Sequence, residues 1–473
     1  MVQDQASESS EEDDRQPFLA VMASIQLDRL PAYASTIRRT HQHGHQSTEV
    51  YATEAGPPIF GSYHVLYPIV FRDRTRWLLK VPADGTRDKF GQSNASALHS
   101  EALTMLLLKR ETSIPLPEVF AFSDTCDNEL NCPFILIEYV EGKPLYDVWF
   151  DKDSPKDIVQ CRRNRSLQDI AAAMVQLDKF TFDKAGSLVF NDQQTPIDVG
   201  PMRFVNTPAM LDRLQCEDPD ESTIYLEAGP FSAPKEYYSV ILSYRGEQSS
   251  SFERGLLSFL RLAISCIPEP APTNKSQKPF VLAHPDMDIQ NFLVDDEGAL
   301  QAIIDWDGVG CVPHTLGNRR YPSFLTRDWD PAMYGWNEDM ERGIEPVGVW
   351  EDSPETLRFY RGVYAGFIAS GAEAHSMTRN SVVYENLHIA ASEPLCTHSI
   401  LEKMFDEIVR ILRDAGTLAE NEHGRSDNTD ESKLEEFDIF NVCWALDENR
   451  LSENDCNILK SGFAKLLQGN EIL

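Results

Sequence analysis

Basic residues are scarce in this chain. Its 473 residues include 43 Lys and Arg against 75 Asp and Glu, which gives a net charge of −32 at pH 7. A surface of this sign repels phosphate backbones and anionic lipid headgroups. We therefore expect neither a nucleic-acid partner nor a membrane partner. The same charge is compatible with a cationic small-molecule ligand, although the charge of a whole chain need not describe its pocket.

Long apolar runs and patterned cysteines are also missing. A bilayer-spanning helix needs about 18 or more apolar residues, and Phe134 to Val140 is about as long as such runs become here. The nine cysteines form no C-x-x-C pair and no zinc-binding spacing with His, so we expect reduced thiols. The acidic N-terminus is unlike a signal or transit peptide, and we expect a cytoplasmic protein.

Glycine-rich phosphate-binding motifs are absent in their usual form. No Walker A sequence occurs, and EAGPPIFGSYHVLYPIVF offers two glycines, Gly56 and Gly61, in a predicted turn between apolar strands. Backbone amides of such a turn, including that of Ser62, can approach phosphates closely. Lys80 follows on the next predicted strand, RWLLKVP. Taken alone, Lys80 is more simply explained as a solvated strand residue.

One group of polar residues, within 280–308, is poorly explained by a structural role. Asp286 follows an apolar run, and Asn291 comes five residues later, just before a short apolar strand. An Asp-Glu-Gly turn at 296–298 then reverses the chain into a second strand that ends at Asp305. Each residue alone is a common turn or cap residue. Together they predict a hairpin that presents two carboxylates and a carboxamide at neighbouring tips.

Phosphoryl transfer uses this set of groups. Its transition state requires little covalent chemistry from the protein. One carboxylate orients the attacking hydroxyl and accepts its proton, and oxygen ligands hold Mg²⁺ against the nucleotide phosphates. Asp286 fits the first role, and Asn291 and Asp305 fit the second.

The pattern H-x-D-x-x-x-x-N, followed by strand, turn, strand and Asp, resembles the catalytic and metal-binding loops of the protein-kinase-like superfamily. Asp305-Trp306 is similar to the aminoglycoside phosphotransferase and choline kinase branch, where Trp commonly follows the metal-binding Asp. The stretches TSIPLPEVFAFS, EYVEGKPLYDVW and LGNRRYPSFLTRDWDPAMY resemble the fungal form of this phosphotransferase enzyme family. Roughly residues 50–370 take part in the resemblance.

The resemblance implies a role for each matching residue. Lys80 would hold the phosphates, Glu101 on a predicted helix at 97–109 would orient Lys80, and His284 would brace the catalytic loop. A linker would contact the adenine through the backbone of Glu138, Tyr139 and Val140. Glu101 could instead be an exposed residue of an amphipathic helix.

An acceptor is expected near aromatic and acidic residues that can stack on a cation or attract it. These residues are Trp306, Asp307, Asp328, Trp329 and Asp330. An equally simple interpretation is that the acids lie on the surface.

The resemblance also implies an α+β, bilobal, protein-kinase-like fold. Its N-lobe is a small antiparallel β-sheet with one helix, and its C-lobe is larger and mainly helical. The predicted segments are an N-terminal extension at 1–47, acidic and expected to be disordered at 1–15; an N-lobe at 48–140; a C-lobe at 141–415; an acidic insertion at 416–436; and a C-terminal helical segment at 437–473.

The leading hypothesis is an ATP- and Mg²⁺-dependent kinase that phosphorylates a hydroxyl of a small molecule. The alternative is a pseudokinase-like nucleotide-binding or regulatory protein with little turnover, which the glycine-poor turn favours. A protein kinase is a third reading, weakened because Asp-Trp-Asp replaces Asp-Phe-Gly. The motifs specify the transfer and leave the acceptor and the oligomeric state open.

Overall fold

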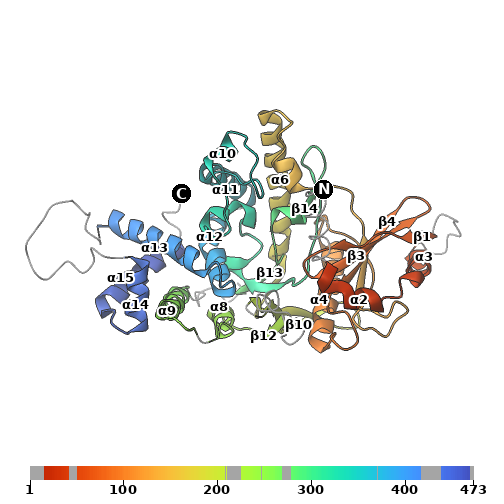
Figure 1. Cartoon of the computed structure of the whole chain (residues 1–473), viewed down its shortest axis with the longest axis horizontal. Coiled ribbons are helices and arrows are strands. Elements are labelled where there is room, and N and C mark those ends of the chain that lie inside the picture. The colour runs from red at the N-terminus through yellow and green to blue at the C-terminus, as the bar shows by residue number, and fades with distance from the viewer. Residues whose placement is uncertain are drawn as a thin grey trace, which may run out of the picture. The chain divides into compact units, whose positions relative to one another are not determined.

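A computed structural model describes residues 15–41, 51–207, 209, 225–246, 248–268, 278–369, 371–416 and 438–468. The acidic segments expected at 1–15 and 416–436 lie outside these residues, apart from Arg15 and Gly416. The chain divides into two compact units (Figure 1). Unit 1 comprises Met1–Leu145, Ser187–Asp198 and Asn291–Val309, and unit 2 comprises Tyr146–Gly186, Val199–Gln290 and Gly310–Leu473.

Unit 1 is built on an antiparallel sheet of six strands, in the order β1-β3-β4-β6-β5 with β2 paired to β3. The strands are β1 (Ala52–Ala55), β2 (Ile59–Phe60), β3 (His64–Phe71), β4 (Arg76–Pro82), β5 (Val119–Ser123) and β6 (Phe134–Glu138). The central strand β4 places Lys80 opposite Leu66 of β3 and Ile135 of β6. One long helix, α4 (Gln92–Glu111), follows β4 in the chain.

The side chains of β4 alternate between the two faces of this sheet, as the pleat requires. Trp77, Leu79 and Val81 point to a core that they share with the N-terminal helices. Lys80 therefore points to the opposite face, where it meets α4. The alternation of side chains along β4 thus decides that Lys80, and not its neighbours Leu79 and Val81, is turned away from the apolar core.

Four short helices cover the apolar face of the sheet, in the part of the predicted N-terminal extension that follows the segment expected to be disordered at 1–15. They are η1 (Gln16–Phe18), α2 (Leu19–Ser24), η2 (Leu27–Arg29) and α3 (Leu30–His41). Phe18, Val21 and Leu30 are fully buried in the core of the sheet. Figure 1 shows α3 beside β1.

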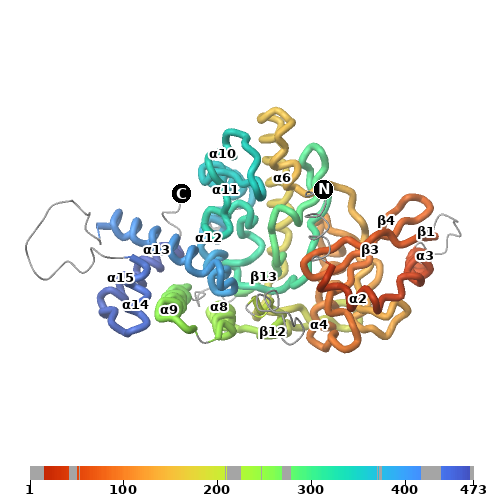
Figure 2. Tube along the Cα trace, in the orientation of Figure 1, coloured from red at the N-terminus to blue at the C-terminus, as the bar shows by residue number. Residues whose placement is uncertain are grey.

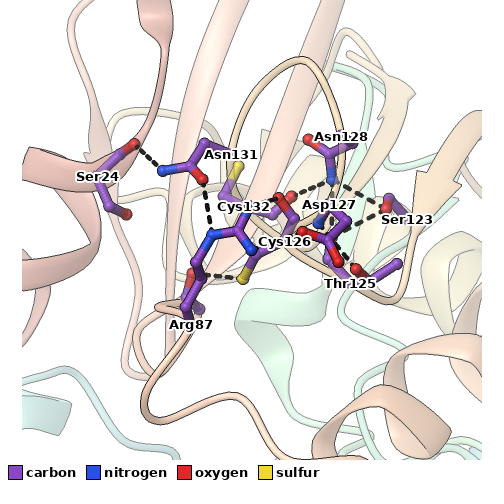
Figure 3. A network of polar contacts seen from close by, with 10 residues as sticks. Ser24, Arg87, Ser123, Thr125, Cys126, Asp127, Asn128, Asn131 and Cys132 are labelled. Carbon is purple, nitrogen blue, oxygen red and sulfur yellow. Dashed lines mark hydrogen bonds and ion pairs between the residues drawn. The ribbon is translucent and has the colours of Figure 1, made fainter.

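A polar network ties these helices to the loop between β5 and β6 (Figure 3). The carboxamide nitrogen of Asn131 donates to the carbonyl of Ser24 at 2.9 Å. Arg87 donates to the Asn131 carboxamide oxygen at 3.2 Å and to Asp127 at 2.6 Å. Cys126 and Cys132 lie in the same loop as buried free thiols.

The predicted hairpin is present and belongs to unit 1. It consists of β14 (Phe292–Val294) and β15 (Leu300–Ile303), and β14 also pairs with β7 (Lys143–Pro144) from the end of the linker. The linker passes so closely that a Cβ on Gly142 would lie 3.1 Å from the Leu293 Cβ.

Unit 2 is mainly helical, as expected. Its larger helices are α6 (Lys156–Val175), α8 (Pro234–Ser243), α9 (Ser251–Ser265), α11 (Pro354–Ile368), α12 (Ala372–Ser392), α13 (Thr397–Asp414), α14 (Ile439–Asp447) and α15 (Glu453–Gln468). The shorter helices of unit 2 are η4 (Gln176–Lys179), η6 (His314–Leu316), η7 (Ser323–Leu325), η8 (Arg327–Trp329) and α10 (Glu338–Glu341). Two more, α5 (Leu145–Trp149) and η5 (Ile289–Asn291), include residues on both sides of a boundary between the units in the chain.

Unit 2 also contains a small sheet, in which β13 (Phe280–Ala283) lies between β16 (Gly310–Pro313) and β8 (Thr181–Phe182). Two further strand pairs are β9 (Ser187–Phe190) with β10 (Pro196–Gly200), and β11 (Met202–Val205) with β12 (Tyr225–Ala228). The boundary between the units falls within β10, after Asp198. All four residues of β13 are buried. Asp286 follows three residues after this rigid strand.

The C-terminal helical segment packs back on the middle of unit 2. Figure 2 shows α14 beside α9, and the Arg254 to Asp447 ion pair joins residues 193 apart in the sequence. A Cβ on Gly255 would overlap the backbone of Cys443, so this close contact requires glycine. The α+β class and the mainly helical second part are thus confirmed. None of the helices in the described ranges has the length and apolarity to cross a membrane.

The covering of the sheet by N-terminal helices generates a stability prediction. Phe18→Ala should lower the free energy of unfolding by about 3 to 5 kcal/mol, because it leaves a cavity in the sheet core. The neighbouring Leu19 is 51% exposed. Leu19→Ala should therefore change the free energy of unfolding by only about 0.5 kcal/mol. Urea unfolding of both variants measures this. Equal effects of the two substitutions would contradict the packing of this arm.

Candidate active site

Lys80 and Glu101 form a buried ion pair in unit 1. The Lys80 ammonium lies 2.7 Å from the Glu101 carboxylate, and the side chains are 9% and 4% exposed. Strand β4 fixes one partner and helix α4 fixes the other. Burial tends to lower the pKa of Lys80, but Glu101 and Asp305 reverse this and hold the pKa above its ordinary value. Lys80 is therefore a fixed positive charge.

Glu101 is less easily kept ionised. Burial raises its pKa above the ordinary value of 4.5, and the Lys80 ammonium opposes that rise. A buried carboxylate without a cation takes up a proton. The charge of Glu101 thus depends on Lys80. The same ion pair lets Glu101, on helix α4, hold the Lys80 ammonium of strand β4 in one orientation.

Asp305 ends the hairpin beside this ion pair. Its carboxylate lies 3.5 Å from the Lys80 ammonium and remains 53% exposed. The backbone of Asp305 has φ of 61°, in the left-handed region that non-glycine residues adopt at a cost of about 1–3 kcal/mol. A carboxylate is thus held in an unfavourable backbone conformation, next to a cation, with one side open to solvent.

Asn291 lies beside Asp305 across the hairpin. The Asn291 carbonyl accepts a hydrogen bond from the Ile304 amide at 2.9 Å. The residues that open and close the hairpin are therefore neighbours, as the sequence predicted. Asn291 is 5% exposed, so its carboxamide is held within the fold.

The donor chemistry of Asn291 and Asp305 fits magnesium. Within the described residues, no group of three or more His, Cys, Asp or Glu side chains is arranged to hold a metal ion. Mg²⁺ is usually held by one or two carboxylates together with substrate phosphates and waters, and it prefers oxygen ligands. One exposed carboxylate and one carboxamide meet that requirement without a complete protein cage.

Trp306 and Asp307 follow directly. Trp306 is 1% exposed, and its indole nitrogen donates to the Ile303 carbonyl at 2.9 Å, so it supports the hairpin from inside. Asp307 lies 4.0 Å from the ring of His64. His64 is the first residue of β3, and it could not be predicted as a neighbour of Asp307, because a histidine at the start of a strand has no distinctive pattern.

The glycine turn is closed by its own backbone bonds. The Gly56 amide donates to the Pro68 carbonyl at 2.7 Å and the Gly61 amide donates to the His64 carbonyl at 2.9 Å. The Gly61 bond closes the β2–β3 turn, and the Gly56 bond continues the pairing of β1 with β3, so both glycine amides are occupied. Gly61 and Ser62 are exposed at the turn. The predicted turn is present, but its glycine amides are already engaged.

The linker residues continue strand β6. The Glu138 amide donates to the Glu118 carbonyl at 2.9 Å, and the Tyr139 amide donates to the Arg76 carbonyl at 3.1 Å. The Arg76 guanidinium also lies 3.8 Å from the centre of the Tyr139 ring. Across the described part of the chain, the Val140 amide has no backbone partner.

Asp286 and His284 belong to unit 2. His284 is fully buried, and its Nδ1 accepts a hydrogen bond from the Asp286 amide at 3.2 Å. The proton of this imidazole, when it is neutral, is therefore on Nε2. Asp286 is exposed. A buried imidazole thus fixes the backbone of a carboxylate that faces solvent.

Asp288 is a second acid of this loop, and its role was not predicted from the sequence. Asp288 is 9% exposed, accepts from the Ile289 amide at 2.8 Å and pairs with Arg327 at 2.6 Å. Its only sequence signal is the spacing Asp-x-Asp after His284. Asp288 caps η5 and has a cation of its own, so it stabilises the loop.

Three of the residues expected near an acceptor have partners inside unit 2. Asp328 forms a two-bond ion pair with Arg361, at 2.6 and 3.0 Å. Trp329 and Asp330 are 4% and 8% exposed. The Asp328 charge is balanced, and the other two side chains are part of the packing. These surroundings favour a structural role over contact with a cation.

The sequence pattern that defines the phosphotransferase enzyme family matches residues 69–313. A fungal relative, altered inheritance of mitochondria protein 9 of Komagataella phaffii, is 25% identical over 360 residues, or 69% of this chain and 54% of that protein. Its counterpart in Candida albicans is 30% identical over 132 residues, or 28% and 21%. The chain spans about half or less of the length of these curated relatives.

The relatives are fungal, which confirms the expected fungal branch. They are also named as mitochondrial proteins, which contradicts the expected cytoplasmic location. That expectation rested on the acidic composition of the first residues, which does not determine where a protein resides.

Solved structures with a similar chain path include Plasmodium vivax ethanolamine kinase, with a TM-score of 0.37, 12% identity and 91% coverage of both chains. Another is a macrolide 2′-phosphotransferase type I, with a TM-score of 0.39, 12% identity and coverage of 79% of this chain and 95% of that one. At these TM-scores the likenesses carry no argument about activity.

The Lys80 and Glu101 pair generates a prediction about pH. Lys80→Met leaves Glu101 buried without its cation, so the folded state should keep the Glu101 proton at pH values where the unfolded chain, with its pKa near 4.5, releases it. The folded state then binds more protons, and the free energy of unfolding should fall by about 2 kcal/mol or more as the pH rises from about 5 to about 8.

Urea unfolding at several pH values measures this fall. The matched control is the double variant Lys80→Met with Glu101→Gln, which has no titrating group at this position and should lack the added pH dependence. Parallel profiles of the single and double variants would contradict the buried ion pair.

Proposed function

The chain belongs to the phosphotransferase enzyme family, and on that premise we propose that it transfers the γ-phosphate of ATP to a hydroxyl of a small molecule, with Mg²⁺. One observation carries the proposal: a buried Lys80 and Glu101 pair lies within 3.5 Å of a half-exposed Asp305 carboxylate. A structural ion pair needs no third, solvent-facing acid in a left-handed backbone conformation. Binding of a metal and phosphates gives that acid a use.

Each residue has one task in this proposal. Lys80 binds the α- and β-phosphates, and Glu101 keeps the ammonium charged and oriented. Asn291 and Asp305 would hold Mg²⁺, which would neutralise charge that develops on the transferred group. The Val140 amide is the hydrogen-bond donor for the adenine.

Asp286 orients the acceptor hydroxyl and accepts its proton. The hydroxyl oxygen attacks the γ-phosphorus, the bond from that phosphorus to the bridging oxygen breaks, and ADP leaves with the bond electrons. The buried His284 holds the Asp286 backbone through Nδ1 and takes no proton from the acceptor. Asp328, one of the acids expected near an acceptor, is already paired with Arg361, so we propose only that the acceptor is a small molecule that carries a hydroxyl.

A second function, nucleotide binding with little turnover, is favoured by one observation. Both glycine amides of the turn are engaged in backbone bonds, whereas efficient kinases use such amides to hold phosphates. The two functions share the nucleotide site and differ in whether Asp286 is needed.

Replacing Asp286 separates them. Asp286→Asn should lower phosphate transfer by about 10²–10⁴-fold, because it removes the proton acceptor while keeping the shape. Transfer is followed with γ-labelled ATP in a metabolite mixture until an acceptor is found, and then by kcat and KM. Nucleotide affinity should stay near that of the unchanged protein.

The control is Asp296→Asn, which removes an acid from the exposed tip of the hairpin, where it pairs with Lys143. It should leave transfer unchanged. If Asp286→Asn retains transfer within about tenfold, the assignment of the base fails. Nucleotide binding without transfer by the unchanged protein would support the second function.

A further inference from the structure

Arg320 lies in the segment LGNRRYPSFLTRD at 316–328 and binds the separate loop that contains Asp286. Arg320 is 8% exposed. One of its terminal nitrogens donates to the carbonyls of His284 and Pro285, at 3.1 and 2.9 Å. The other donates to the Leu316 carbonyl at 3.1 Å. One guanidinium therefore binds the two peptide groups directly before Asp286.

These bonds fix the backbone conformation directly before Asp286, and with it the direction of the Asp286 side chain. The carbonyls of His284 and Pro285 lie beyond the end of β13, and a buried carbonyl that lacks a partner is costly. The next amide, that of Asp286, donates to the His284 imidazole. The backbone is thus bound by Arg320 before Asp286 and by His284 at Asp286 itself.

Arg320 stands on a segment that is anchored to several helices. Asn318 donates to the Met174 carbonyl of α6 at 2.8 Å. Arg319 donates to Asp178 and to the Ile368 carbonyl at the end of α11. The Tyr321 amide donates to Ser381 of α12 at 3.1 Å. Successive residues therefore hold different helices, and the guanidinium has little freedom to move.

Helix α12 supplies the counter-charge. The Glu385 carboxylate lies 3.5 Å from the Arg320 Nε, and its other oxygen accepts from the Thr326 hydroxyl at 3.4 Å. Burial raises the pKa of Glu385 to about 7; Arg320 and the Thr326 hydroxyl oppose this rise, and the nearby Asp288 and Asp286 contribute to it.

A contribution to stability alone does not explain this arrangement. A buried ion pair is often no more stabilising than apolar residues of the same volume. A guanidinium, however, donates several hydrogen bonds in a fixed planar geometry that neither an apolar side chain nor lysine reproduces. The observed bonds use that geometry on the two carbonyls that precede Asp286.

We propose that Arg320 is a positioning residue for Asp286, and that Glu385 keeps its guanidinium in place. Arg320 touches neither nucleotide nor acceptor and acts through the backbone of His284 and Pro285. The proposal rests on the proposed function for its catalytic consequence, but the positioning itself can be measured without any turnover.

Hydrogen–deuterium exchange measures the positioning directly. In Arg320→Gln, peptides that cover residues 284–290 should exchange about tenfold faster or more, because the local opening of this loop becomes easier. Arg319→Gln is the matched control, since it removes a neighbouring arginine that binds Asp178 and Ile368 instead. It should speed exchange around those two residues and leave 284–290 unchanged.

A second variant guards against a simple failure to fold. Arg320→Gln leaves Glu385 buried without its cation. The double variant Arg320→Met with Glu385→Met removes both charges, so it should fold and still lose protection at 284–290. Arg320→Lys keeps the charge but lacks the planar donors, so it should not restore protection.

The catalytic consequence appears in the split between kcat and KM. The double Met variant should lower kcat by about 10–100-fold, as expected for a displaced catalytic group, and change KM for ATP by less than about threefold. Arg319→Gln should keep the original kcat when the two proteins are compared at equal folded fraction.

Two results would overturn the positioning role. One is unchanged exchange at 284–290 in both Arg320→Gln and the double Met variant. The other is an equal loss of kcat in Arg319→Gln, which would make the role of Arg320 merely structural. If the unchanged protein transfers no phosphate, the proposed function fails, and the exchange result still decides whether Arg320 positions the loop.

Discussion

The buried ion pair of Lys80 and Glu101 is the interaction on which unit 1 depends. Two charges that are both almost inaccessible to water need each other, because either one alone would be costly in the interior. The pair therefore fixes the register of helix α4 on strand β4. It also leaves the Lys80 charge within 3.5 Å of Asp305, so the same constraint that joins helix and strand prepares an electrostatic site.

The rest of unit 1 holds that site still. The N-terminal helices bury the opposite face of the sheet, so Lys80 has only one face on which to point. The linker strand β7 pairs with β14, which keeps the hairpin and its Asp305 in the same compact unit as Lys80. In unit 2 the corresponding task falls to His284 and Arg320, which bind the backbone around Asp286. In each unit, polar groups with a proposed catalytic role are held by buried, charged or hydrogen-bonded neighbours.

The sequence predicted the parts of this account that have a local pattern. The short, mainly apolar segment RWLLKVP identified β4, and apolar segments around an Asp-Glu-Gly turn identified the hairpin. The spacing of Asp286, Asn291 and Asp305 indicated the chemistry. Helix α12 was missed because its buried positions include Thr378, Ser381 and Glu385, which break the apolar period. Arg320 was missed because its hydrogen-bond partners are backbone carbonyls. Every residue has a backbone carbonyl, so the sequence does not show which of them an arginine binds.

The central proposal is that Lys80 binds the nucleotide phosphates directly, while Asn291 and Asp305 would hold the Mg²⁺ that accompanies them. Thermal unfolding with ATP, measured with and without Mg²⁺, tests it most directly, because a ligand that binds the folded state raises the melting temperature. The account predicts stabilisation by ATP that requires Mg²⁺ and disappears in Asp305→Asn. Stabilisation that is equally large without Mg²⁺, or that persists in Asp305→Asn, would contradict it, as would the absence of any stabilisation.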